Sequence, residues 1–579
     1  MNDTTREPRE GPAAPSSGTV PAGTLVPLFI GLMLAMLLFS LNQTVFSTAL
    51  PTVVGELNGV SQMVWVITAF ILAATIAMPI YGKLGDQIGR RPLLIFAIIV
   101  FMAGSVVGAL AGNMTVLIVA RVIQGLGGGG LMILSQASIA DVVPARERGR
   151  YMGIMGGVFA LSSVAGPLLG GWFTEGPGWR WAFWISIPLG LLALFAAIFY
   201  LKLPRKNVGR PTLDWGGMVM ISVATTALVL VTTWGGGDYA WTDPVILGLI
   251  ALFLIAAVVF VLVERRSAEP IIPMSLFREK NFNLATIAGL FIGVSMFGAL
   301  GYMPTYLQMA FGVDATGSGL LMIPMMGMML LTSITTGQLV SKRGNYKWYP
   351  VAGSIIIAIA MVMLSTLDPE HPVWFACLDM AVLGVGLGLS MQILVLMVQN
   401  TFHISMVGTA TASNNYFRQI GATLGSSLVG SLFTSRLAPL FTERMPAAAA
   451  GQMGSSESLT PASVGQLPPA IHDTVVTAYS DALTPIYLWI APLGVIAAVL
   501  LTFITEKPLA TRIERGIDSD PLATGSNSIV SPRAPEVVQA SAEDDARAEA
   551  ERDRPGQEAA EHQTDEHQTE DREAVSRRS

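Results

Sequence analysis

The sequence predicts an all-α protein that crosses a membrane many times. Of its 579 residues, 52% are hydrophobic and only 13% are charged, whereas a soluble globular protein carries about a quarter charged residues. The charges gather in short clusters and in one tail, separated by apolar stretches. Each stretch has about twenty residues, enough to cross a hydrocarbon core of roughly 30 Å as a helix. In chain order, fourteen predicted spans run roughly over residues 25–48, 61–81, 92–111, 116–139, 150–172, 180–201, 214–233, 245–263, 283–304, 316–337, 348–367, 373–397, 407–434 and 482–504.

The basic residues predict the orientation of these spans. One set of loops carries Lys83 and Arg90, Arg146 and Arg150, and further clusters at 202–210, 265–280 and 342–347. The alternate set is nearly free of Lys and Arg until residues 436–444. Because loops rich in Lys and Arg stay in the cytoplasm, we expect a multi-pass protein of the cell (plasma) membrane with both termini inside.

An internal repeat divides the chain. Gly82 recurs as Gly337, and Gly166 and Gly170 recur as Gly421 and Gly425, all separated by 255 residues. Duplicated helix bundles with a site between them are common in secondary transporters. We therefore predict two six-helix bundles with spans 214–233 and 245–263 inserted between them as a hairpin. The expected parts are a disordered leader (1–24), an N-terminal bundle (25–201), a linker with the hairpin (202–282), a C-terminal bundle (283–505) with a long external loop (436–480), and a disordered cytoplasmic tail (506–579).

The loop after the second span has a charged, glycine-containing pattern. It contains Gly82, Asp86, Gly89, Arg90 and Arg91. Asp86 could accept hydrogen bonds from a neighbouring helix N-terminus, or pair with an arginine across the halves, and so latch one conformation. The alternative is that Asp86 and Arg90 form a solvated pair within the loop.

Two further motifs lie inside the spans. Arg121, followed by Gln124 and a run of glycines, lies within the fourth span, where a charge must face a cavity or a partner. Gly166, Pro167, Gly170 and Gly171 lie in the fifth, where small residues permit close packing and proline bends the helix. With the loop pattern, these resemble the gating, arginine and antiporter motifs of the major facilitator superfamily.

Other segments narrow the resemblance. They are Leu41–Thr44, Trp179–Phe183, Asp214–Gly217, Pro304–Gln308 and Phe417–Gly421. Together with fourteen spans they resemble the fourteen-helix drug:proton antiporter family of QacA/EmrB type, over roughly residues 25–509. The resemblance implies a monomer that exports amphipathic or cationic small molecules by alternating access, in exchange for protons.

Several other classes are disfavoured. The chain has one cysteine and lacks a phosphate-binding loop, a catalytic Ser/His/Asp set and metal-ligand spacing. We therefore expect no enzyme, cofactor, metal or nucleic-acid partner, and a protein whose partners are a small-molecule substrate, protons and the lipid bilayer. Two alternatives remain: a same-fold exporter of a lipid or metabolite, and a membrane sensor that no longer transports.

The chain departs from the resembled family at a residue that matters for protons. Asn42 stands where that family usually has an aspartate partnered by the arginine that corresponds to Arg121, and an amide cannot titrate. Asp379 is the acid at matching depth in the other half, so we expect it to carry the proton, with Arg121 as its partner and Arg418 competing. Alternatively, Asp379 lies at the membrane interface or neutralises Arg418.

The cargo cavity is expected between the two halves. Its predicted polar and adaptable lining consists of Asn42, Gln43, Gln124, Gln308 and Met325. Packing is the competing role for Met325, because it belongs to a methionine cluster on one helix.

Overall fold

The computed structural model describes residues 22–57, 59, 62–201, 212–236, 239–444, 464 and 467–511, which are mostly helical. They belong to one unit, Met1–Glu514. The helices that position the site are α1 (Ala22–Glu56), α2 (Met63–Ile88), α3 (Arg90–Ala109), α4 (Met114–Val142), α5 (Ala145–Glu175), α6 (Trp181–Trp184), α7 (Ser186–Phe199), α8 (Trp215–Trp234), α9 (Pro244–Arg266), α10 (Lys280–Leu300), α11 (Met303–Phe311), α12 (Ala315–Leu321), α13 (Ile323–Arg343), α14 (Trp348–Leu364), α15 (Val373–Thr401), α16 (Val407–Arg444) and α19 (Pro469–Thr502), with a 3-10 turn at Leu276–Arg278.

Among the described residues, twelve helical segments are long and apolar enough to cross a membrane. The two remaining expected spans are α14 and α16. The first is apolar but has 17 residues. The second has 38 residues but carries buried polar side chains, including Thr411, Asn414 and Asn415, which face other helices. The predicted count of fourteen membrane spans therefore holds only if α14 and α16 cross the membrane as well.

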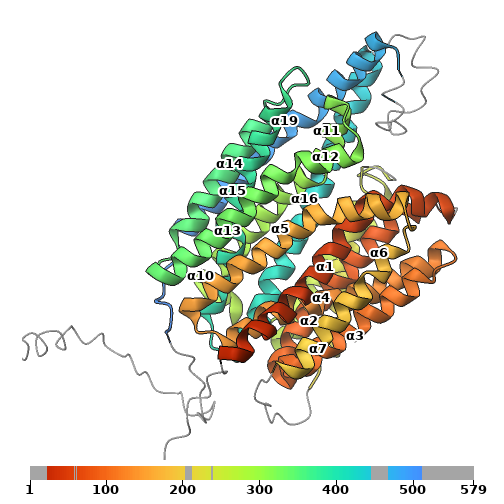
Figure 1. Ribbon diagram of the computed structural model, residues 1–579. Helices are drawn as coiled ribbons and strands as arrows, with labels where there is room; N and C mark the ends of the chain where they lie inside the picture. Colours follow the sequence, from red (N-terminus) through yellow and green to blue (C-terminus); the bar gives the residue numbers. More distant parts are fainter. Residues whose placement is uncertain are drawn as a thin grey trace, which may run out of the picture. The chain divides into compact units, whose positions relative to one another are not determined.

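Two helix pairs join the first part of the chain to the last. Figure 1 shows α1–α4, α6 and α7 gathered on one side and α13–α15 with α19 on the other. Across the boundary α5 packs along α13, and α2 packs along α16. We call these contacts the α5–α13 seam and the α2–α16 seam.

One pair of repeated glycines, Gly82 and Gly337, lies at these seams. A Cβ on Gly82 of α2 would collide with Ala412 and with the backbone of Gly408 in α16. A Cβ on Gly337 of α13 would collide with the backbone of Gly149 in α5. Thus each glycine lets the second helix of one half approach the fifth helix of the other.

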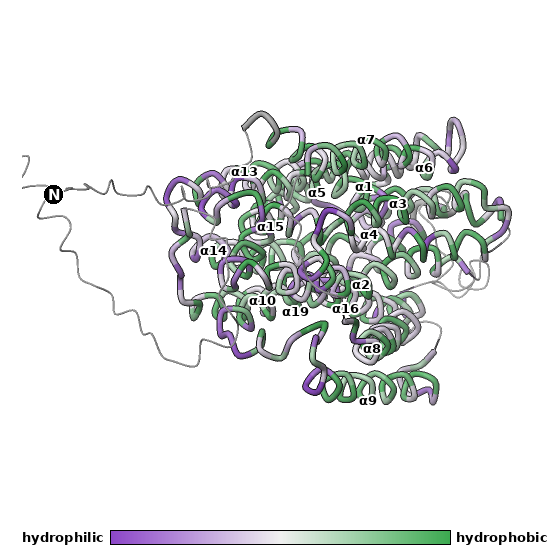
Figure 2. The backbone as a smooth tube through the Cα atoms, turned by 90° about the horizontal axis from the view of Figure 1, so that it is seen from below, coloured by the Kyte–Doolittle hydropathy of each residue, from purple (hydrophilic) through white to green (hydrophobic). Residues whose placement is uncertain are grey.

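The expected hairpin, α8 and α9, lies against the α2–α16 seam. Seen from below in Figure 2, α8 lies next to α2 and α16, and α9 lies at the edge. The Thr225 hydroxyl of α8 hydrogen-bonds Tyr416 of α16 at 2.7 Å, and Trp234 packs edge-on against Trp65 of α2. Trp241, in the loop before α9, donates to Ser431 Oγ at 3.0 Å. The hairpin therefore touches helices from both parts of the chain.

Two predicted boundaries shift. Helices occupy both ends of the expected loop 436–480, because α16 continues to Arg444 and α19 begins at Pro469. The expected tail is ordered at its start, because Glu506 accepts a hydrogen bond from Tyr346 N at 2.6 Å and the backbone of Lys507 also bonds Tyr346. Residues 1–21, 202–211, 445–463 and 512–579, which hold most of the leader, linker, loop and tail, lie outside the described residues.

Candidate functional site

We call the end of the helices where α2 stops and α5 and α16 begin the inner end, because it is the end that the basic loops predict to be cytoplasmic. Asp86, in the last turn of α2, lies against the first turn of α16. Its carboxylate accepts hydrogen bonds from Gly408 N at 3.1 Å, Thr409 N at 2.6 Å and Thr409 Oγ1 at 2.9 Å. The backbone N–H groups of a helix N-terminus have no partner within the helix and attract negative charge. Asp86 therefore closes the α2–α16 seam at the inner end.

Arg90 orients this carboxylate. It is 3% exposed and pairs with Asp86 at 3.0 Å and with Asp141 of α4 at 2.8 Å. Gly89 makes the tight turn between α2 and α3, with φ at +101°. Arg91 points elsewhere, donating to Ile198 O of α7 at 2.7 Å. The Asp86–Arg90 pair is thus buried and not solvated, which excludes the alternative of an exposed loop pair.

The other seam has a weaker equivalent. Ser341, which the repeat aligns with Asp86, accepts a hydrogen bond from Arg150 N in the first turns of α5 at 3.0 Å. The Arg146 side chain donates to the backbone of Ser341 at 3.3 Å and of Lys342 at 3.1 Å. Both seams are therefore closed at the inner end.

Arg121 is enclosed in the N-terminal half. It is 1% exposed, and its guanidinium donates to Asn42 Oδ1, to Gln124 Oε1 at 3.0 Å and to Val66 O at 2.9 Å. The rings of Phe46 and Phe70 lie 4.5 and 4.2 Å from it. No acidic side chain within the described ranges forms an ion pair with Arg121. Its charge is stabilised by neutral oxygens and by aromatic faces.

Asp379 is fully buried in α15, and neither of its carboxylate oxygens has a hydrogen-bond partner among the described residues. The expected pairing of Asp379 with Arg121 or Arg418 is absent in this conformation. Arg121 is bonded as above, and Arg418 donates to Asn415 Oδ1 at 2.5 Å. Because Asp379 is fully buried, its side chain faces neither lipid nor open solvent. Matching depth along two helices does not fix the direction in which each residue points around its axis.

The antiporter motif packs α5 tightly onto α1. A Cβ on Gly166 would collide with Thr44, and one on Gly170 with Thr48 and the backbone of Val45. Thr48 donates to the carbonyl oxygen of Pro167 at 3.2 Å. The fourth residue of the motif, Gly171, faces open space. Three of the four motif residues therefore hold α1 and α5 together.

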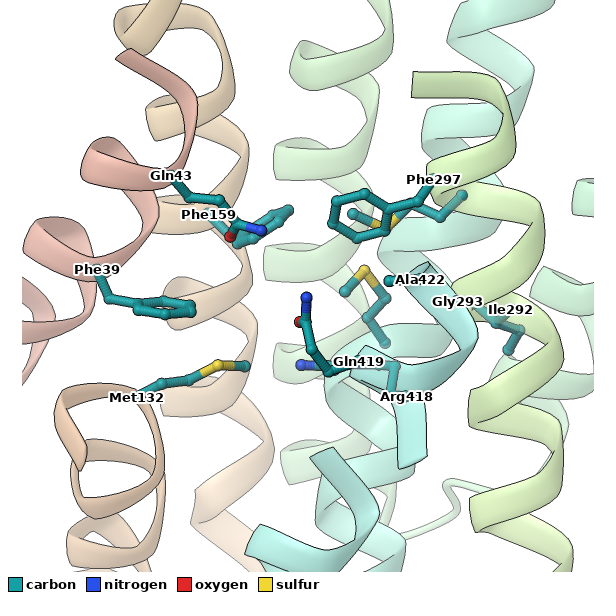
Figure 3. Close-up of a pocket in the computed structure, with 12 residues that line it drawn as sticks. Phe39, Gln43, Met132, Phe159, Ile292, Gly293, Phe297, Arg418, Gln419 and Ala422 are labelled. Atoms are coloured by element: carbon teal, nitrogen blue, oxygen red, sulfur yellow. The ribbon is translucent and has the colours of Figure 1, made fainter. Parts of the chain in front are cut away.

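A small cavity lies between the halves (Figure 3). Phe39, Gln43 and Met132 line one side, and Arg418, Gln419 and Phe297 face them from the other. Its volume is about 20 Å³, close to the minimum for one water molecule. Of the residues expected here, Gln43 lines the cavity, whereas Asn42 and Gln124 bind Arg121. Gln308 and Met325 do not line it: the former bonds Ser318 at 3.1 Å, and the latter is 1% exposed in the core.

A larger cleft lies toward the opposite, outer end. It has a volume of about 650 Å³, within the range of small-molecule sites. None of the described residues that line it is charged, and many are hydroxyl-bearing: Thr68 of α2, Thr232 and Thr233 of α8, Thr305 of α11, and Ser426, Ser427, Ser431 and Thr434 of α16. The halves are thus closed at the inner end and separated at the outer end.

Comparisons with known proteins agree with this architecture. A profile of the Major Facilitator Superfamily matches residues 32–426. The chain belongs to the major facilitator superfamily. An MFS-type transporter of Mycobacterium tuberculosis is 38% identical, over 86% of this chain and 72% of that protein. The multidrug transporter protein MdtP of Bacillus subtilis is 35% identical, over 87% and 97%.

A solved facilitator shares the fold. The proton:xylose symporter XylE has a TM-score of 0.56 at 17% identity, covering 84% of this chain and 98% of its own. Family and relatives make this facilitator a membrane transporter and not an enzyme.

Sequence reasoning missed a buried polar link between the halves of this facilitator. Asn415 of α16 donates to the side-chain oxygen of Gln136 of α4 at 2.9 Å, and Gln399 of α15 donates to the backbone carbonyl of Gln136 at 3.3 Å. It also missed Gln419 in the cavity. The available signal was an amide side chain inside an apolar span, which is costly unless it has a partner.

Proposed function

We propose that this chain is a proton-coupled multidrug efflux transporter that exports amphipathic or cationic small molecules by alternating access. One observation carries the proposal: the inner end is closed by Asp86 on the α16 N-terminus while a cleft of about 650 Å³ opens at the outer end. An exporter passes through this outward-facing geometry when it releases its cargo, and the direction of transport rests on the relatives. The relative MdtP, named a multidrug transporter, supports efflux of drugs.

For coupling, we propose Asp379 as the proton carrier. A buried carboxylate without hydrogen-bond partners is costly when charged, so it favours the protonated form until a partner reaches it. In the proposed cycle a change of access brings an arginine toward Asp379, with Arg121 and Arg418 as candidates. The proton is then released to the inner side.

The wider organisation belongs to the same proposal. We place the protein in the plasma membrane as a monomer with fourteen spans, counting α14 and α16, and with both termini in the cytoplasm. The two bundles are those predicted from the repeat, 25–201 and 283–505, with α8 and α9 inserted between them.

The test is efflux of dyes of different charge from cells that express the protein, with and without a protonophore. We expect efflux that the protonophore abolishes. Efflux that persists would refute proton coupling, and no efflux of any probe would favour a sensor that no longer transports.

The outer cleft favours a second candidate, the export of a neutral lipid or metabolite. Its lining is hydroxyl-rich and uncharged in the described residues, which suits an uncharged polar headgroup better than a cation. Fluorescent lipid analogues in the same assay separate the two candidates, because a drug exporter prefers cationic dyes and a lipid exporter prefers the analogues.

A further inference from the structure

The inner ends of α8 and α9 bring two acidic side chains together, far along the chain from the residues discussed so far. Asp214 precedes α8, and its Oδ1 accepts a hydrogen bond from Gly217 N at 2.8 Å. Glu264 lies in the last turn of α9 and is 2% exposed. A Cβ on Gly217 would lie 2.9 Å from Asp214 Oδ2 and 2.9 Å from Glu264 Oε1. The two carboxylates therefore converge on one point, and the glycine leaves room for both.

These carboxylates have too few donors for two negative charges. Glu264 Oε1 accepts from Ile271 N at 3.1 Å, and the Ile272 N–H also faces the carboxylate. Glu264 Oε2 and Asp214 Oδ2 are buried without a hydrogen bond of ordinary geometry among the described residues. Leaving a charged group buried and unpaired is expensive. Two carboxylates in one site cannot both ionise cheaply.

The charged groups around the pair do not neutralise it. Lys83 of α2 faces it but is bonded to Glu269 at 2.6 Å. That hydrogen bond holds the pKa of Glu269 below its usual value, so Lys83 already has a charged partner. The adjacent Arg265 and Arg266 are exposed.

We propose that Asp214 and Glu264 together bind one proton, at a site separate from the central cavity. Binding of one proton removes one of the two negative charges that meet at Gly217, and it turns one carboxylate oxygen into a hydrogen-bond donor. The proton belongs to the pair and to neither residue alone.

The site lies beside a small crevice and is linked to the inner closure. The crevice, about 10 Å³, is lined by Lys83, Gln87, Asp214 and Glu269 and has room for about one water molecule, through which a proton can arrive from the inner side. When the proton leaves, repulsion drives apart the inner ends of α8 and α9. Lys83–Glu269 then transmits the movement to α2, one turn before Asp86. The pair thereby makes the inner closure sensitive to pH.

The test uses infrared difference spectra of the purified full-length protein, which detect the carbonyl stretch of protonated carboxyl groups. We expect Glu264→Gln and Asp214→Asn each to lose one such band that the wild type has, and the wild-type band to disappear as pH rises. Asp243→Asn is the matched control. Asp243 caps α9 as Asp214 caps α8, accepting from Val245 N at 2.8 Å, but it lies at the opposite end of α9 from Glu264.

Retention of the wild-type band in Glu264→Gln or in Asp214→Asn would overturn the proposal, as would loss of the same band in Asp243→Asn. If Glu264→Gln does not fold, Asp214→Asn decides alone, because asparagine can still cap α8. The measurement needs no transport, so its outcome is independent of whether the protein exports drugs.

Discussion

Replacing Asp86 by asparagine tests the closure of the inner end most directly. The carboxylate accepts three hydrogen bonds from the start of α16 and one from Arg90, and its side chain is 5% exposed. Asparagine keeps one acceptor oxygen but turns an NH2 group toward Thr409, whose hydroxyl can rotate to accept from it while the Thr409 N–H loses its acceptor. Hydrogen bonds to charged groups contribute about 1.5–3 kcal/mol each, and neutral ones about 1. Losing one bond and weakening the others should destabilise the inner-closed state by about 2–3 kcal/mol.

That free energy corresponds to a roughly 30- to 150-fold shift of the access equilibrium toward inward-facing forms. Spin labels at Arg150 of α5 and Arg343 of α13, both exposed, report the distance across the inner end in a Cys377→Ala background. We expect Asp86→Asn to add a longer distance and to slow efflux while cargo binding persists.

Ser341→Ala is the matched control, because Ser341 is the repeat counterpart of Asp86 and its bond to Arg150 N is neutral. Its loss should cost about 1 kcal/mol and produce a smaller shift. Equal distance distributions in Asp86→Asn and the wild type would refute the assigned role of Asp86. Equal shifts in the two variants would show that charge is not the source of the closure.

Three further outcomes are expected. Asp379→Asn should bind cargo but lose efflux driven by a proton gradient; normal pH-dependent efflux in this variant would end its role as proton carrier. Asn42→Asp puts a carboxylate within hydrogen-bond reach of the Arg121 guanidinium, so the pH profile of efflux should shift relative to the wild type. An unchanged profile would mean that position 42 plays no part in coupling. Glu56→Gln tests stability, since a hydrogen bond from Arg180 holds the pKa of Glu56 below its usual value. A carboxyl group whose pKa is lowered by folding stabilises the protein at pH values above its unfolded pKa of about 4.3. This stabilisation is lost as the pH falls through the folded pKa, so the Tm of the wild type should exceed that of Glu56→Gln near neutral pH and match it in acid. A difference in Tm that does not change with pH would contradict this.

The sequence predicts positions along the helix axes better than directions around them. The contact of Asp86 with a neighbouring helix N-terminus is predictable, because the residue ends a helix and few partners are chemically suitable. The expected pairing of Asp379 with Arg121 is not found, because equal depth leaves the rotation of α4 and α15 undetermined.

The same limitation affects the cavity. Gln43 points into it, but its neighbour Asn42 points to Arg121. The methionine cluster did not predict where the side chain of Met325 points. The residue packs in the core and does not line the cavity. The place of α8 against α2 and α16 is also beyond sequence patterns, because an apolar helix carries no signal for the helices that it will contact.

The position of α8 makes the two seams unequal. Duplicated halves would expose the α2–α16 and α5–α13 seams to lipid alike, but Trp234, Thr225 and Trp241 attach the hairpin to the former. The hairpin therefore shields the α2–α16 seam from lipid and leaves the α5–α13 seam without this cover. If the two halves move against each other as proposed, α8 has to change its contacts with α2 or with α16, so the two seams would not open in the same way.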